Sequence, residues 1–191
     1  MDEQEFMSLA GQGVGARTAK VEIGDLERMV SESPSAEQVC LKLARIFSVH
    51  RNEIALLRIE KGSLRFIFPV ELRAAGLLPL TGTAVAARSA TTHTPFLSNS
   101  FTRVRHASLF EAVRLSSEDE DSNSDQMPIQ KIISAPITTR DGVVLGVVQV
   151  SHKGLDAQLT GPDFTAEDMK MLTQVAGILQ RMPFMQPGAE I

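Results

Sequence analysis

The dipeptide Asp141-Gly142, which separates two apolar runs, is the feature that most constrains the fold. The run before it, KIISAPIT, covers Lys131–Thr138, and the run after it, VVLGVVQVSH, covers Val143–His152. Asp and Gly tolerate the positive φ angles of tight hairpin turns, and both runs are rich in the β-branched residues that favour strands. The sequence therefore predicts an antiparallel hairpin at this point.

A second hairpin is predicted around Lys61-Gly62, between the runs EIALLRIE at 53–60 and SLRFIFPV at 63–70. The chain between the two hairpins is irregular. Its Ala-rich stretch at 83–89 favours a short helix, and Thr94-Pro95 turns the chain into the short extended piece PFLS.

The chain over residues 101–127 contains an apolar stretch followed by an acidic one. Apolar spacing over 101–115 predicts a short amphipathic helix. The string SSEDEDSNSD that follows is polar and acidic, so it cannot bury enough apolar area to offset its ordering entropy. We expect a mobile acidic loop at about 116–127.

Longer helices are predicted on either side of these strands. Ser35 and Gln38 have capping-box spacing, and the run that follows them carries apolar residues at helical intervals. Thr165 and Asp168 repeat that spacing before a last helix that extends to Met182. This order of elements predicts an α+β fold, in which terminal helices cover one face of an antiparallel sheet.

Composition narrows the possible functions. The 191 residues suit one domain, which we place at 25–183, with a flexible N-terminal tail at 1–24 and a C-terminal tail at 184–191. The net charge of −4 argues against nucleic acid as a partner. No membrane span and no secretory signal are evident, so we expect a cytoplasmic protein that does not bind membranes. The single cysteine excludes an internal disulfide, and the four histidines lack metal-ligand spacing, so we expect neither a metal nor a cofactor.

Three strings in this order resemble the GAF domain family of small-molecule sensor modules. They are PLTGTAVAARSATTHTPFLS, IISAPITTRDGVVLGVVQVSHK and FTAEDMKMLTQVAGILQ, and the resemblance runs from about Ser35 to Leu179. It implies a GAF-like (PAS/GAF-type) sheet with the N- and C-terminal helices on one face and the irregular helical segment over the other. It also implies a ligand pocket between that segment and the sheet.

The resemblance bears on particular family activities. Lys153, Phe164 and Asp168 match part of the signature of cyclic-nucleotide-binding members, whereas His152 and Met169 depart from it. By this resemblance, Lys153 and Asp168 form a structural ion pair and are not ligand contacts.

Cys40 limits two further activities of the family. It lies in the first helix, outside the region where bilin-binding members carry a cysteine. Members that reduce free methionine sulfoxide need several cysteines, and this chain has one. We therefore expect no enzymatic activity, and we expect Cys40 to be a core residue.

Strand alternation indicates which residues could line the implied pocket. If Arg58, Ser134 and Gln149 share one face of the sheet, an apolar surface would carry a few convergent polar groups, as ligand pockets do. The alternative is that these groups are solvated or locally satisfied. Arg103 and Arg105 could bind an anion, although a solvated face is favoured for them. The candidate ligand-binding residues are Arg58, Phe66, Phe68, Thr92, Phe96, Arg103, Arg105, Ser134 and Gln149.

The last helix is apolar on more than one side, whereas covering one sheet needs only one stripe. We therefore predict a homodimer interface that contains Met171, Val175, Ile178 and Met182. The alternative is that this second side covers the N-terminal turn of the same chain.

Two functions remain open. The first is a stand-alone sensor that binds an unidentified small molecule and signals to a partner protein in trans or through a homodimer. The second is a dimerisation or protein-interaction module that senses nothing, with a pocket filled by Phe66, Phe68 and Phe96.

Overall fold

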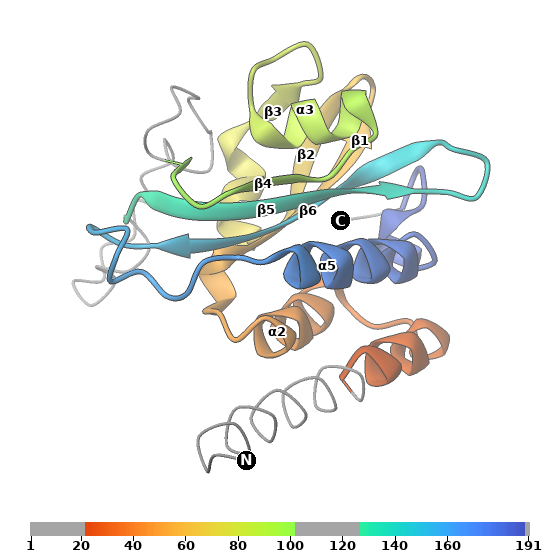
Figure 1. Cartoon of the computed structure of the whole chain (residues 1–191). Coiled ribbons are helices and arrows are strands. Elements are labelled where there is room, and N and C mark those ends of the chain that lie inside the picture. The colour runs from red at the N-terminus through yellow and green to blue at the C-terminus, as the bar shows by residue number, and fades with distance from the viewer. Residues whose placement is uncertain (1–21, 102–126, 190–191) are drawn as a thin grey trace.

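The computed structural model describes residues 22–101 and 127–189, and Figure 1 shows their arrangement. Residues 22–29 are helical, and the other helices are α2 (Ala36–Ile46), α3 (Val85–Thr92) and α5 (Ala166–Leu179). The strands are β1 (Ile54–Glu60), β2 (Ser63–Phe68), β3 (Leu77–Pro79), β4 (Phe96–Ser98), β5 (Ile129–Thr138) and β6 (Val144–Lys153). Short 3-10 turns are η1 (Val30–Glu32), η2 (Arg51–Glu53), η3 (Val70–Ala75) and η5 (Pro183–Met185).

The strands form one six-stranded sheet in the order β3-β2-β1-β6-β5-β4, and every neighbouring pair is antiparallel. Both predicted hairpins are confirmed. Lys61 and Gly62 have φ angles of 48° and 79°, as a two-residue hairpin turn requires. At the other turn Gly142 has φ 82°, and its amide donates to the Thr139 carbonyl oxygen at 3.0 Å.

Helices cover both faces of the sheet, so the core has two layers. Figure 1 shows α2 and α5 on one face, called here the helix face, and α3 on the other, called the α3 face. The larger apolar cluster joins α2 and α5 to the sheet, and the smaller cluster lies beneath α3. The predicted α+β architecture, with terminal helices on one face of an antiparallel sheet and a helical segment over the other, is therefore confirmed.

Both predicted capping boxes are present. The Ser35 hydroxyl accepts from the Gln38 amide at 3.2 Å, and the Gln38 side chain accepts from the Ser35 amide at 2.9 Å. Thr165 and Asp168 make the same reciprocal pair at the start of α5. Each box satisfies helix-start amides that have no partner within the helix, which fixes where α2 and α5 begin.

The helix over residues 22–29 belongs to the helix face. Leu26 is fully buried in the cluster that contains α2 and α5, and Lys42 of α2 forms ion pairs with Glu22 and Asp25. The predicted tail over 1–24 therefore overlaps this helix at residues 22–24, and the ion pair from Glu22 to Lys42 lies within the overlap.

This packing corrects the predicted dimer interface. Val175, Ile178 and Met182 are buried within the chain, and Met171 is partly buried against the same cluster. The second apolar side of α5 is covered by the chain itself, with Leu26 in the shared cluster, as in the alternative considered above. Val175, Ile178 and Met182 are thus part of the protein's own core, with Met171 packed against it, and they leave little surface for a second copy.

The chain after α5 folds back onto the sheet and is not a tail over the part that the structure describes. Residues 183–189, called here the C-terminal strap, begin with η5, and Met185 is completely buried in the helix-face cluster. Arg103, Arg105 and nearly all of the predicted helix at 101–115 and acidic loop at 116–127 lie outside the described residues.

Candidate functional site

The α3 face carries a polar cluster where α3 crosses β5 and β6. Ser89 of α3, Ser134 of β5 and Gln149 of β6 are 1%, 0% and 5% exposed. The Ser89 hydroxyl donates to the Ser134 hydroxyl at 3.0 Å, and the Gln149 side-chain amide donates to the same oxygen at 3.3 Å. We call these three residues the polar triad; they converge on one buried oxygen atom.

Strand pairing explains how the triad forms. Ser134 lies directly opposite Gln149 in the β5–β6 ladder and opposite Phe96 in the β4–β5 ladder. Residues opposite one another in a ladder point to the same face, so the two polar side chains lie side by side under α3. Ser89 then reaches them from above, since Ala86, Ala87 and Ala90 are small enough to let α3 approach the sheet.

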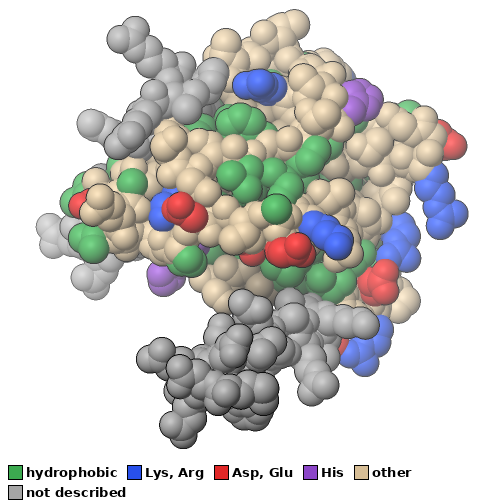
Figure 2. Space-filling model, in the orientation of Figure 1, with side chains coloured by type: hydrophobic (Ala, Val, Ile, Leu, Met, Phe, Trp, Pro, Cys, Tyr) green, Lys and Arg blue, Asp and Glu red, His purple; other side chains and the backbone are tan. Residues whose placement is uncertain are grey.

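Apolar residues surround the triad on the α3 face. Ala55, Leu57, Phe66 and Val147 are all buried in the cluster beneath α3. Phe96 is partly buried at its edge, and the Arg88 guanidinium lies over the Phe96 ring, 5.6 Å from its centroid. Figure 2 shows hydrophobic side chains at the surface over α3, β4 and β5. A few polar groups in an apolar setting can orient a small ligand through hydrogen bonds.

The structure brings together only part of the predicted site. Ser134, Gln149 and Phe66 share the α3 face, with Phe96 beside them. Thr92 is exposed at the end of α3, where its hydroxyl donates to the Arg88 carbonyl oxygen at 2.8 Å.

Phe68 lies on the helix face, away from the predicted pocket, and a β-bulge is the reason. Leu56 pairs with Phe68 while Leu57 pairs with Phe66, so β2 contains one more residue than β1 at this point. The extra residue, Ile67, reverses the alternation, and both Ile67 and Phe68 enter the helix-face cluster.

Arg58 does not share a face with Ser134 and Gln149; the alternative of a locally satisfied polar group applies to it. It lies opposite Gly146 in the β1–β6 ladder, and its alternation partners Ile54 and Leu56 belong to the helix-face cluster. Its guanidinium is buried, 4% exposed, and donates to the carbonyl oxygens of Phe184 at 2.7 Å and Ala189 at 2.8 Å. It also pairs with the Glu60 carboxylate. Arg58 therefore holds the C-terminal strap and lines no pocket on the α3 face.

Ser89 is the member of the triad that we did not predict. It stands in the string AVAARSATT, where Val85, Ala86 and Ala90 mark the buried side of a helix. Ser89 lies three residues after Ala86 and is therefore on that buried side. A hydroxyl residue on the small, apolar side of a helix is a sequence signal that could have indicated Ser89.

The predicted Lys153–Asp168 ion pair stays a prediction. The Lys153 ammonium donates to the Asn52 carbonyl oxygen at 2.7 Å. The Asp168 carboxylate accepts from the amide and the hydroxyl of Thr165, at 2.7 Å and 2.8 Å. Asp168 thus has a capping role at α5 that the family signature alone did not indicate.

His152 lies beside this region in a buried aromatic stack. Its ring is nearly parallel to the Phe164 ring, with centroids 4.5 Å apart and planes 6° apart. Burial lowers the pKa of the His152 imidazole; Lys131 acts in the same direction, while the Glu53 and Asp168 carboxylates oppose the shift. The folded protein therefore favours the neutral ring.

This preference makes stability depend on pH. Because the unfolded chain takes up the proton at a higher pH than the folded one, we expect the free energy of unfolding to fall between about pH 7.5 and about pH 5.5. His152→Phe keeps a ring against Phe164 and should remove this part of the dependence. The measurement is urea unfolding followed by circular dichroism at both pH values.

A matched control for this experiment is His93→Asn. His93 is exposed with φ 56°, a conformation that Asn tolerates, so this variant should keep the wild-type pH dependence. Equal pH dependence in the wild type and in His152→Phe would contradict the role given to His152.

Cys40 is a core residue, as predicted. It is completely buried in α2 on the helix face, and burial raises the pKa of its thiol. A buried neutral thiol is a poor nucleophile, and this one lies on the opposite side of the sheet from the polar triad.

The described residues also limit other kinds of site. Over residues 22–101 and 127–189, no group of three or more His, Cys, Asp or Glu side chains is placed to hold a metal ion. None of the helices in that part of the chain is both long and apolar enough to cross a membrane.

The structure also contains a cavity of about 330 Å³ in an unpredicted place, on the helix face beside the C-terminal strap. The ligand pocket implied by the sequence was expected beneath α3 instead.

Comparisons with known proteins give a consistent result. The family model described as GAF domain matches residues 35–180. Among solved structures, the GAF domain of a phosphoenolpyruvate-protein phosphotransferase from Coxiella burnetii has a TM-score of 0.62 at 14% identity, covering 87% of this chain and 93% of that one. The corresponding GAF domain from Acinetobacter has a TM-score of 0.60 at 10% identity, covering 85% and 90%.

An enzyme of the same fold is also similar. The free methionine-R-sulfoxide reductase of Neisseria meningitidis, solved in complex with its substrate, has a TM-score of 0.58 at 14% identity and covers 86% of this chain and 87% of that one. At these identities the likeness concerns the fold alone. No curated protein matches the sequence.

Proposed function

The chain belongs to the GAF domain family, and from this we propose that it is a regulatory domain that senses a small molecule bound between α3 and the sheet. The observation that carries the proposal is the polar triad, because three buried polar side chains converge there inside an apolar layer. Burying polar groups costs free energy unless they are paired, and an apolar core would need none of them.

The triad suits a ligand with a hydroxyl, amide or carboxylate group. Ser134 can donate or accept, and Gln149 offers both an amide donor and a carbonyl acceptor. A ligand group that replaces the Ser89–Ser134 hydrogen bond would separate α3 from β5. Motion of α3 would carry the signal to a partner protein or to a second copy of the chain.

A second candidate function is supported by the packing of the same layer. Phe66, Leu57 and Val147 are buried within the α3-face cluster, and the triad side chains already bond to one another. A layer that satisfies itself in this way would suit a domain that only binds another protein. Phe68 plays no part in filling this layer, since it lies on the other face.

We also propose that the domain performs no thiol chemistry. The support is the position of Cys40 in α2, fully buried and on the face opposite the triad. A substrate bound beneath α3 would be separated from the thiol by the sheet itself.

Ligand-induced stabilisation separates the two candidate functions. For a sensor, a compound in a panel of nucleotides, amino acids and organic acids should raise the melting temperature; at 100 times its Kd it adds about 2.7 kcal/mol. Ser134→Ala removes the atom on which the triad converges, so we expect the response to be lost. The variant itself should cost about 1–2 kcal/mol, because two donors lose their acceptor.

Ser151→Ala is the matched control. Ser151 is a completely buried serine of β6, whose hydroxyl donates to the Glu53 carbonyl oxygen at 3.1 Å, away from the triad. It should lose a similar amount of stability and keep the ligand response. If no compound stabilises the wild type, the sensor proposal fails and the interaction module is favoured.

A further inference from the structure

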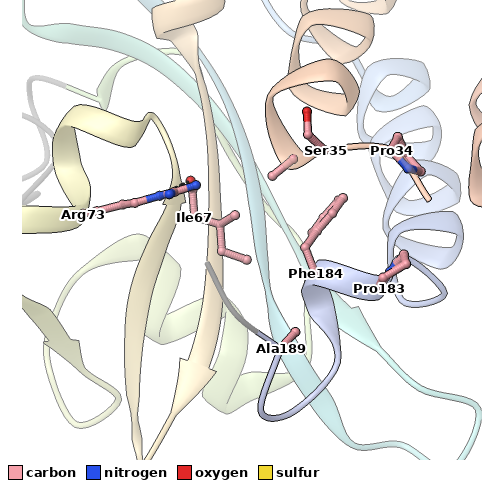
Figure 3. A pocket seen from close by; sticks show the side chains of 8 residues that line it. Pro34, Ser35, Ile67, Arg73, Pro183, Phe184 and Ala189 are labelled. Carbon is pink, nitrogen blue, oxygen red and sulfur yellow. Dashed lines mark hydrogen bonds between the residues drawn. The ribbon is translucent and has the colours of Figure 1, made fainter.

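The cavity on the helix face lies where four separate segments of the chain meet. Figure 3 shows Ile67 of β2 at its base, the start of α2 on one side and the C-terminal strap on the other, with Arg73 of η3 at its end. The lining residues are Pro34, Ser35, Ala36, Ile67, Arg73, Pro183, Phe184 and Ala189. The volume of about 330 Å³ is at the lower end of the range for ligand pockets.

The lining combines an apolar body with one cation. Most of the side chains that face the cavity are hydrocarbon, with Ile67 and Phe184 the largest. Arg73 is the one charged lining residue, and its Nε donates to the Ile67 carbonyl oxygen at 3.0 Å. That bond fixes the plane of the guanidinium, whose two terminal amino groups make no further hydrogen bond or ion pair within the described residues.

The start of α2 adds to the positive potential of the cavity. The Ser35 hydroxyl accepts from the Gln38 amide. The backbone amides of Ala36 and Glu37 also belong to the first turn of α2, where amides have no acceptor within the helix. The positive end of the α2 dipole therefore lies at the wall of the cavity, which Arg73 also lines.

Two acidic side chains near the cavity, among the residues that the structure describes, are already paired. Glu37 in the first turn of α2 bonds to Arg51 at 3.3 Å, and Glu71 of η3 lies 4.0 Å from the same guanidinium. Arg51 therefore offsets the negative charge of Glu37 and Glu71, so these carboxylates do not neutralise Arg73.

We propose that this cavity binds a small monocarboxylate with an aliphatic tail, a short or medium-chain fatty acid. The tail lies against Ile67 and Phe184, and the carboxylate takes the terminal amino groups of Arg73, which match a carboxylate geometrically. This site is separate from the triad, since it lies on the opposite face of the sheet.

Binding at this site stabilises the docked strap. Three of the eight lining residues, Pro183, Phe184 and Ala189, belong to the strap. A ligand that contacts them in the docked position favours that position by linkage.

The test uses octanoate, with octan-1-ol as a probe of equal tail length and no charge. In protein labelled at the isoleucine methyl groups, octanoate should shift the Ile67 resonance saturably, and octan-1-ol should bind at least about tenfold more weakly. Arg73→Gln should reduce the octanoate affinity about tenfold and leave that of octan-1-ol unchanged. An unshifted Ile67 methyl, or equal affinity for the two probes, overturns the proposal.

Two variants keep the test independent of folding and of the triad. Ala189→Leu fills the cavity from the strap, and the backbone carbonyl at position 189 still accepts from Arg58. We therefore expect this variant to bind neither octanoate nor octan-1-ol. Ser134→Ala changes only the α3 face and should bind octanoate as the wild type does. The opposite result would overturn this assignment. If Ser134→Ala abolishes octanoate binding and Ala189→Leu leaves it intact, the ligand binds beneath α3.

Discussion

Arg58→Met is expected to destabilise the protein by about 3 kcal/mol. The substitution keeps an apolar stem of similar length and removes the buried guanidinium. The carbonyl oxygens of Phe184 and Ala189 then lose their donor, and Glu60 loses its closest cation. The strap can regain hydrogen bonds only by leaving the sheet, which exposes the fully buried Met185.

Urea unfolding followed by far-ultraviolet circular dichroism measures this loss, since the chain has neither Trp nor Tyr for intrinsic fluorescence. Hydrogen exchange should also show faster exchange at the amides of Met185 and Gln186, which bond within the strap region. Arg65→Met is the matched control: Arg65 also pairs with Glu60, at 3.3 Å, but its side chain is 46% exposed. The free energy of unfolding of Arg65→Met should fall by less than about 1 kcal/mol. Equal losses in the two variants would contradict the role given to Arg58.

Gly146→Ala is expected to cost about 3 kcal/mol or more, through overpacking. A Cβ atom at this position would lie 2.0 Å from the Leu57 carbonyl oxygen and 2.7 Å from the Met185 side chain. The side-chain atom can move, but the carbonyl belongs to the neighbouring strand β1. The substitution therefore forces β1 and β6 apart where they pair at the centre of the sheet.

The measurement is again urea unfolding, with Gly177→Ala as the matched control. Gly177 is an exposed position within α5, and a Cβ there meets nothing within 4 Å. Alanine is the better helix former, so this control should gain up to about 1 kcal/mol. Near-neutral stability of Gly146→Ala would show that the β1–β6 ladder relaxes far more easily than its geometry implies.

The elements that sequence analysis predicted well are those whose signals are local. The turn at Lys61-Gly62 and the cap at Ser35 depend on residues within a few positions of one another, and both are present. The order of helices and strands then limits the layers to one arrangement, which the structure confirms.

The site was harder to predict because it depends on one residue of register. The bulge that places both Ile67 and Phe68 on the helix face has no Gly, Pro or polar residue within Phe66–Phe68 to mark it, although Pro69 follows directly. Arg58 was misplaced for a different reason: its partners, the strap carbonyls, lie more than 120 positions away in the sequence. Backbone acceptors carry no side-chain signature, so no motif could have indicated them.

The last helix shows the same limit. Val175, Ile178 and Met182 form an apolar side that a sequence pattern cannot assign to a second copy or to the chain's own N-terminal helix. The burial of Leu26 against this layer decides the question for the described residues.

The outer strands of the sheet have a consequence for handling the protein at high concentration. β3 and β4 contain three residues each, and β3 ends in a proline, which cannot donate to a further strand. The ten-residue strand β6 lies between β1 and β5, and β4 pairs with Ile132, Ile133 and Ser134 of the ten-residue β5. Long strands left unpaired at an edge are the usual templates for growth into aggregates, and here both outermost strands of the described sheet are short. Concentrated samples should therefore resist fibril formation as long as the sheet stays folded.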